Sequence, residues 1–391
     1  MSNGPEDILD ALIESAINAG RYASGLVGQI VKILKQLEKE LVEAIGASIA
    51  RAKKERRELR AMLKETRKTI QDAYAEVIKE AGKSLAVFGK LEIKNTQAAI
   101  NVALGIDAKK LGIPEVTAKA LAEKVQVLGT PAEKYWHKQA EATRKRFEAV
   151  VQKGIIEART TAEIAREVRG TPEAPGIIEA SKREAEALAR TAVQSVANEA
   201  RQKTYEANAD LITGYMHLST LDNRTTPICM ARSGAEWDAQ LRPIPPNDKP
   251  YEVPPLHFNC RSVIIPVLKS FAELAGEDAP STGEKEATQE RLFREKLTAK
   301  LRKQGLTERQ IANELAGKRA AMNGQAPRNV TFDQWLRGKS EKFQNDLLGP
   351  KRAALWRAGK ITLADLTNQR DRPLTLKELE ELIEKRASRK K

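Results

Sequence analysis

The chain has 391 residues and a formal net charge of +14, with 67 Lys and Arg residues against 53 Asp and Glu residues. Charged residues make up 31% and aromatic residues only 4%, a balance that favours helices with one solvated face. Two cysteines are too few for a disulfide-stabilised secreted fold. No apolar run reaches the roughly 18–20 residues that cross a membrane, and the acidic start does not resemble a signal peptide. We therefore expect a protein kept in a reducing cytoplasm or in a particle assembled there, with an anionic partner such as nucleic acid.

The N-terminal part is predicted to be helical. Pro5–Asp7 fit a first helical turn, and apolar residues then recur every three or four positions over residues 28–82. This spacing predicts one long helix or a helical hairpin that packs against another helix, with a membrane-surface helix as the alternative. The run holds a strongly basic segment at residues 51–68 that is a candidate for contact with nucleic acid, although a solvated helix face is the simpler interpretation. The candidate contact residues are Arg51, Lys53, Lys54, Arg56, Arg57 and Arg60.

Glycines at 89, 105, 112 and 129 are predicted to interrupt the following region. A helix should then begin with Thr130 as its cap and Pro131 at its first position, and a shorter helix at Thr160. A long helix is predicted over residues 178–209. Beside its apolar stripe it carries a polar face made of Arg190, Thr191, Gln194, Asn198 and Arg201.

The spacing of apolar residues changes from a helical to a strand-like pattern after this helix. Residues 211–218, 234–237 and 261–267 have the β-branched and aromatic character of strands, and residues 226–232 fit a short helix. We expect a mainly α protein with a small α+β domain: long N-terminal helices, a compact antiparallel sheet in the middle and a helical C-terminal module. The predicted divisions are residues 1–130, 131–277 and 278–391, the last beginning with a linker at 278–288 and ending in a basic tail.

Residues 218–268, the motif segment, carry the least generic chemistry. Cys229, His257 and Cys260 are three credible zinc ligands, and the last two are three residues apart. A closed zinc site needs a fourth ligand, which Asp222 or a water would have to supply. We therefore expect no cofactor, with zinc as the weaker alternative, and interpret Asp222, Arg224 and Thr225 as a turn that packs on the loop before Cys260.

Other reaction classes find little support in the sequence. A Cys–His hydrolase would need an oxyanion loop, and none is recognisable. The sequence also lacks a phosphate-binding loop of the type that ATP hydrolysis requires.

The motif segment resembles the phage Mu F-like minor head proteins, also called phage head morphogenesis proteins. The resemblance rests on the pattern Asp222, Arg224, Thr225, Cys229, Gly234, Trp237, Pro254, Pro255, Leu256, His257, Asn259, Cys260 and Arg261, and on a second block in the C-terminal module. Many members carry two further cysteines where this chain has Thr226 and Ser262. That difference argues that the motif holds together without metal.

The resemblance implies a non-enzymatic virion component, assembled in the host cytoplasm and present in several copies per particle. Its expected partners are the portal protein, other head proteins and non-specific double-stranded DNA. The expected roles are head assembly, DNA packaging or DNA ejection. Two alternatives stay open: a zinc-dependent or Cys/His hydrolase acting in maturation or entry, and an ejected protein associated with DNA or a membrane.

Overall fold

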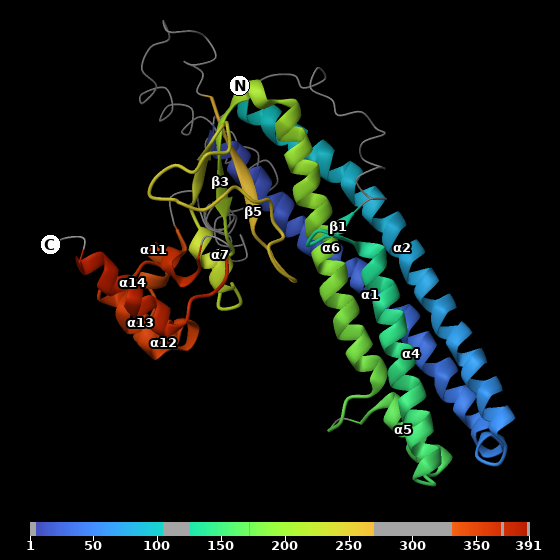
Figure 1. Cartoon of the computed structure of the whole chain (residues 1–391). Helices are drawn as coiled ribbons and strands as arrows, with labels where there is room; N and C mark the ends of the chain where they lie inside the picture. Colours follow the sequence, from blue (N-terminus) through green and yellow to red (C-terminus); the bar gives the residue numbers. More distant parts are fainter. Residues whose placement is uncertain (1–4, 105–124, 172, 270–330, 369–370, 389–391) are drawn as a thin grey trace, which may run out of the picture.

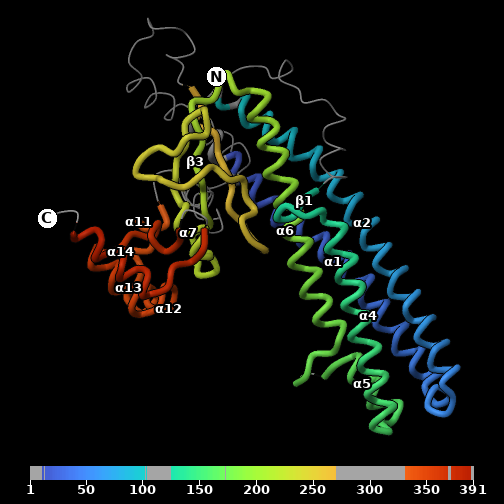
Figure 2. Tube along the Cα trace, in the orientation of Figure 1, coloured from blue at the N-terminus to red at the C-terminus, as the bar shows by residue number. Residues whose placement is uncertain are grey.

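The structure is a computed structural model that describes residues 5–104, 125–171, 173–269, 331–368 and 371–388. It has the predicted mainly α architecture, with long N-terminal helices, a small antiparallel sheet and a helical C-terminal module (Figure 1). Tracing the chain shows a long helical arm on one side and the sheet with the C-terminal helices on the other (Figure 2).

The N-terminal helices form an antiparallel hairpin. α1 (Pro5–Ala52) and α2 (Arg56–Leu104) pack along each other and are joined by the short turn at 53–55. The hairpin alternative is confirmed, but both helices run well beyond the predicted span of 28–82. Gly89 does not end α2, because its neighbours Phe88 and Ile93 are buried, and such packing offsets the cost of about 1 kcal/mol of a helical glycine.

Three further helices complete the arm: α4 (Ala132–Ile156), α5 (Thr161–Arg169) and α6 (Ile177–Ala207). α6 packs against α1, α2 and α4, and the apolar stripe predicted on the first helix is fully closed to solvent, with Leu34, Leu41 and Ile45 each 0% exposed. α5 begins at the predicted position, where Thr160 and Glu163 form a capping box.

The predicted start of α4 is wrong by one residue. Thr130 and Pro131 form the short strand β2 (Thr130–Pro131), which pairs antiparallel with β1 (Gln126–Val127). The turn between them contains Gly129 at φ +74°, a conformation that glycine adopts without strain. α4 therefore starts at Ala132, and Thr130 is a strand residue rather than a helix cap.

The expected antiparallel sheet has three strands, in the order β4-β3-β5. β3 (Ile212–Leu218) follows the one-turn 3-10 helix η2 (Ala209–Leu211) and lies between β4 (Glu236–Asp238) and β5 (Val263–Leu268). Tyr215 of the central strand is opposite Trp237 on one side and Pro266 on the other. The short helix α7 (Pro227–Arg232) connects β3 to β4.

The C-terminal module consists of α11 (Phe332–Arg337), α12 (Glu341–Leu348), α13 (Pro350–Arg357), the 3-10 helix η3 (Leu363–Leu366) and α14 (Leu376–Ser388). It packs on α7, where the fully buried Arg232 places Nη2 2.7 Å from Asp371 Oδ2. The predicted linker at 278–288 and the helices expected between it and residue 322 lie outside the described residues.

The described residues contain two apolar cores. One lies within the arm and joins α1, α2, α4, α5 and most of α6. The other joins the sheet, the C-terminal module and the ends of α1 and α2 near the sheet. α6 contributes to both, so it connects the arm to the sheet; the domain boundaries drawn from the sequence stay a prediction. Among the described helices, none has the length and apolar character to span a membrane.

Candidate functional site

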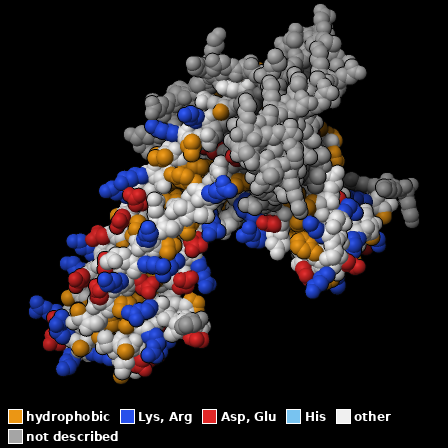
Figure 3. All heavy atoms as spheres, turned by 180° about the vertical axis from the view of Figure 1, so that it is seen from behind, with side chains coloured by type: hydrophobic (Ala, Val, Ile, Leu, Met, Phe, Trp, Pro, Cys, Tyr) orange, Lys and Arg blue, Asp and Glu red, His pale blue; other side chains and the backbone are white. Residues whose placement is uncertain are grey.

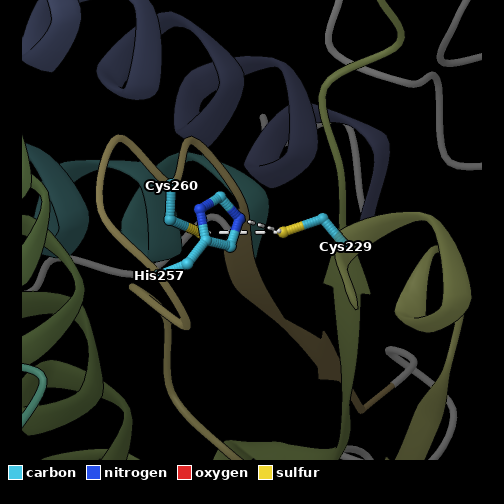
Figure 4. Close-up of side chains that lie close together, drawn as sticks. All are labelled: Cys229, His257 and Cys260. Atoms are coloured by element: carbon cyan, nitrogen blue, oxygen red, sulfur yellow. Dashed lines mark hydrogen bonds between the residues drawn. The ribbon is translucent and has the colours of Figure 1, made fainter. Parts of the chain in front are cut away.

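Cys229, His257 and Cys260 converge on one point. Cys229 comes from α7, and the other two come from the loop that leads into β5; their side chains face one another (Figure 4). The Cys229 Sγ atom lies 3.7 Å from Cys260 Sγ and 3.2 Å from His257 Nε2. Both cysteines are free and buried, and the histidine is partly exposed. The sequence-predicted ligand set is therefore one cluster, although 28 residues separate Cys229 from His257.

The polar face predicted on α6 holds the loop in place. The backbone N–H of Asn259 donates to Thr191 Oγ1 at 2.9 Å, and Gln194 Nε2 donates to the Ser262 carbonyl at 3.0 Å. Asn259 adopts φ +59°, a left-handed conformation that Asn tolerates better than most residues. The face is buried apart from Arg190, so it positions a loop instead of being solvated.

Asp222 completes the attachment of the loop from the other side. Arg261 donates from Nη1 and Nη2 to the two carboxylate oxygens of Asp222, at 2.6 and 2.7 Å. Asp222 Oδ1 also accepts from the backbone N–H of Arg224, and Thr225 Oγ1 donates to the Thr220 carbonyl. The expected packing of this turn on the loop is observed. The suggestion of Asp222 as fourth metal ligand is wrong, because Arg261 binds both of its oxygens.

The imidazole of His257 has a defined orientation. Its Nδ1 lies 2.8 Å from the Phe258 carbonyl, which only an N–H at Nδ1 can satisfy, so the neutral ring carries its lone pair on Nε2. Nε2 faces Cys229 and also lies 2.8 Å from Thr226 Oγ1. The hydrogen bond to Cys260, together with burial, raises the pKa of the Cys229 thiol. The hydrogen bond from Cys229, together with the nearby His257, holds the pKa of the Cys260 thiol below its usual value.

A small polar hollow opens beside the cluster. Cys229, His257 and Thr226 line it together with Arg224, Arg261 and Ser262, and its volume is about 190 Å³ including its mouth. Thr226 and Ser262, where related sequences were expected to carry cysteines, are therefore both at the cluster. Pro255 is partly exposed in the loop and follows the buried Pro254 through a cis peptide bond.

Comparison with known protein families gives a match that includes the cluster. Residues 145–265 match the family described as phage Mu protein F like protein. The chain therefore carries a phage Mu protein F like region. No curated protein and no solved structure gave a significant match to the chain. The family implies a phage head morphogenesis protein associated with the virion, and it suggests a structural rather than an enzymatic role.

The phage Mu protein F like region begins within α4 and ends within β5, so it contains the cluster, α6 and the sheet except for the second half of β5. It leaves out the α1–α2 hairpin and the described C-terminal helices. The arm therefore combines helices from inside the region with helices from outside it, and their shared core means that the region packs on the hairpin.

One buried residue near the cluster was missed by the sequence analysis. His217 on β3 is 0% exposed, and neither ring nitrogen has a hydrogen-bond partner among the described residues. Burial lowers the pKa of His217 to about 4, so the ring is neutral near pH 7. Its strand position carried no signal that distinguished it from an ordinary apolar core residue.

The six basic candidates for nucleic-acid contact lie at the end of the arm farthest from the sheet (Figure 1). Every one of them is exposed. Arg51 Nε lies 3.5 Å from Glu58 Oε2, and Lys53 Nζ donates to the Arg159 carbonyl. Within the described residues, the others pair with no acidic side chain: Lys54, Arg56, Arg57 and Arg60. Figure 3 shows Lys and Arg side chains along the arm and at this end of it, interspersed with Asp and Glu.

Proposed function

We propose that this protein is a minor head protein of a tailed phage, associated with the portal or the procapsid interior, and that it acts in head assembly, DNA packaging or DNA ejection. The observation that carries the proposal is the phage Mu protein F like region at 145–265. A role in one of these steps needs contact with other head components, and a role near packaged DNA also needs a surface that tolerates dense phosphate charge.

The arrangement of charge supports separate surfaces for head components and for DNA. The turn of the α1–α2 hairpin is exposed and basic, and it lies at the opposite end of the arm from the sheet and the C-terminal module. Four of its cations have no acidic partner within the described part of the chain, so their charge is available to phosphates. Lys and Arg side chains of this kind bind the DNA backbone through counterion release, without reading sequence.

The sheet end of the molecule would then contact the portal or another head protein, while the tip of the arm reaches DNA. The long apolar seam of the hairpin is already buried against α6 and α4. That seam is therefore occupied within the chain, and a partner would contact the outer faces of the arm.

Purification of assembled particles tests the proposal. Phage particles and procapsids made with and without the portal protein are separated on density gradients, and this protein is quantified in each fraction by mass spectrometry. We expect several copies per portal-containing particle and a strong loss from portal-free procapsids. Absence from particles of both kinds, with the protein free in the lysate, would refute the proposal.

A further inference from the structure

We propose that Cys229, His257 and Cys260 form a binding site for a zinc-class divalent cation, with the fourth coordination position open to the adjacent hollow. This assignment is independent of the role in head assembly. It rests on the distances between the three ligand atoms, on the orientation of the imidazole ring and on the space beside the cluster.

The distances match one shared ion. Two thiolates that each lie about 2.3 Å from a tetrahedral zinc ion are about 3.8 Å apart, and the two sulfur atoms here are 3.7 Å apart. A thiolate and an imidazole nitrogen on the same ion are about 3.5 Å apart, and Cys229 Sγ lies 3.2 Å from His257 Nε2. All three ligand atoms lie within 4.8 Å of one another, so the two sulfurs and the imidazole nitrogen gather around one point.

The imidazole is oriented as a ligand. Histidines that bind metal commonly donate the other ring N–H to a carbonyl or carboxylate, which fixes the tautomer. His257 does this through Nδ1 and the Phe258 carbonyl, so the lone pair of Nε2 faces the sulfur of Cys229. The loop that presents the ring is itself fixed by hydrogen bonds from α6 and by the Asp222–Arg261 pair.

The fourth position has room for a solvent molecule. Cys229 and His257 both line the polar hollow, so the side of the cluster between them is open. The Thr226 hydroxyl lies on the same side, 2.8 Å from Nε2, where it can hydrogen-bond to a water on the ion. Two thiolates balance the charge of a divalent cation, so the centre would be neutral. Soft sulfur and imidazole ligands select zinc over magnesium or calcium.

A bound ion would connect α7 to the loop before β5. α7 follows the central strand β3, and the loop precedes the neighbouring strand β5. The Thr226–His257, Cys229–His257 and Cys229–Cys260 contacts already join the two elements at the cluster. The ion would therefore stabilise the motif segment in its folded arrangement, as ligands that bind only the native state do.

Metal titration of the full-length protein tests the site. The protein is purified under reducing conditions, stripped with a chelator and titrated with zinc or with cobalt(II). We expect about one zinc per chain and a thiolate-to-cobalt charge-transfer band with the intensity of two thiolates. Zinc should also raise the thermal unfolding midpoint. Reduced wild-type protein that holds no stoichiometric metal and gives no thiolate band would overturn the assignment. This measurement uses the wild-type protein alone, so it does not depend on a variant that folds.

Substitutions identify the ligands. Cys229→Ser, Cys260→Ser and His257→Gln should each weaken zinc binding by at least about tenfold. His137→Gln is the matched control, since this histidine is exposed on α4 and should leave binding unchanged. Circular dichroism confirms that each variant retains its helices. Unchanged affinity in a folded cysteine variant would place the metal elsewhere and contradict the proposal.

Discussion

Arg201 on α6 and Glu92 on α2 form an ion pair that is closed to solvent. Arg201 Nη2 lies 2.7 Å from Glu92 Oε1, and each side chain is 1% exposed. Ser15 on α1 donates its hydroxyl to the same carboxylate at 2.7 Å, so three helices meet at one polar point inside the arm. A buried charge that loses its partner is strongly destabilising, and the contact therefore selects one alignment of the hairpin on α6.

Glu92→Gln should lower the free energy of unfolding by about 3 kcal/mol, because it leaves the Arg201 guanidinium buried without a counter-charge. Urea denaturation followed by helical circular dichroism measures the loss. Glu199→Gln is the control, since Glu199 is exposed on α6, the helix that carries Arg201, and its replacement should change stability by less than about 0.5 kcal/mol. Equal effects of the two substitutions would show that the buried pair contributes nothing specific.

Gly214 of β3 leaves no space for a side chain. A Cβ atom there would lie 2.5 Å from the backbone oxygen of Trp237 on β4, and backbone cannot move aside as a flexible side chain can. Gly214→Ala should therefore destabilise the protein by about 1–3 kcal/mol. Gly82→Ala provides the contrast, since a Cβ on this exposed position of α2 meets nothing within 4 Å. It should stabilise by up to about 1 kcal/mol through helix propensity. Thermal unfolding of both variants checks the opposite signs, and a stable Gly214→Ala protein would contradict the close approach of the strands.

Periodicity was sufficient to predict the long helices and the three-stranded sheet, since apolar spacing reports directly on which face is buried. It missed the two-residue strands β1 and β2. It located α6, α7 and all three strands of the sheet within a few residues. It was insufficient for α2, where Gly89 suggested a break that tertiary packing overrides. The three-residue spacing of His257 and Cys260 already required them to be neighbours.

The partners of polar residues could not be predicted in the same way. The polar face of α6 was visible in the sequence, but a stripe of Thr, Gln, Asn and Arg looks the same whether water or protein covers it. Glu92 lies 109 residues before Arg201, and in an isolated sequence it is one of many helical glutamates. The same holds for the contact between Asp222 and Arg261, whose bidentate geometry appears only when the loop folds back.

The Asp222–Arg261 pair predicts a dependence of stability on pH. Burial raises the pKa of Asp222, but the hydrogen bonds and charge of Arg261 outweigh it and hold the pKa at about 2, below the ordinary value of 3.8. A carboxyl with a lowered native pKa contributes stability that is present above about pH 4 and is lost as the pH falls toward about 2. Because Arg261 is 35% exposed, solvent screening limits the contribution to about 1 kcal/mol.

Comparison of wild type with Asp222→Asn over that range isolates the pair. We expect wild type to be more stable by a constant amount above about pH 4 and the difference to shrink at lower pH. Asp72→Asn, at an exposed position of α2, controls for the general loss of carboxylate charge. If the stability difference between wild type and Asp222→Asn stays constant down to about pH 2, protonation of Asp222 does not contribute to the pH dependence of stability.

The basic tip of the arm should bind DNA through phosphate contacts. Replacing its four unpaired cations with Gln should weaken binding to any duplex sequence and make the slope of log affinity against log salt less steep by up to about 3.6. Fluorescence anisotropy with two unrelated duplexes, over a range of salt concentrations, measures both effects. The substituted residues are Lys54, Arg56, Arg57 and Arg60.

A control variant separates this local effect from net charge. Four exposed lysines of the C-terminal module are replaced with Gln, so that the total charge falls by the same amount: Lys342, Lys351, Lys360 and Lys377. If the tip contacts phosphates, this control keeps most of the wild-type affinity and salt slope, because screening at physiological salt confines electrostatic effects to about 8 Å. Equal weakening in the two variants would assign DNA binding to the overall charge of +14 and remove the tip as a specific contact surface.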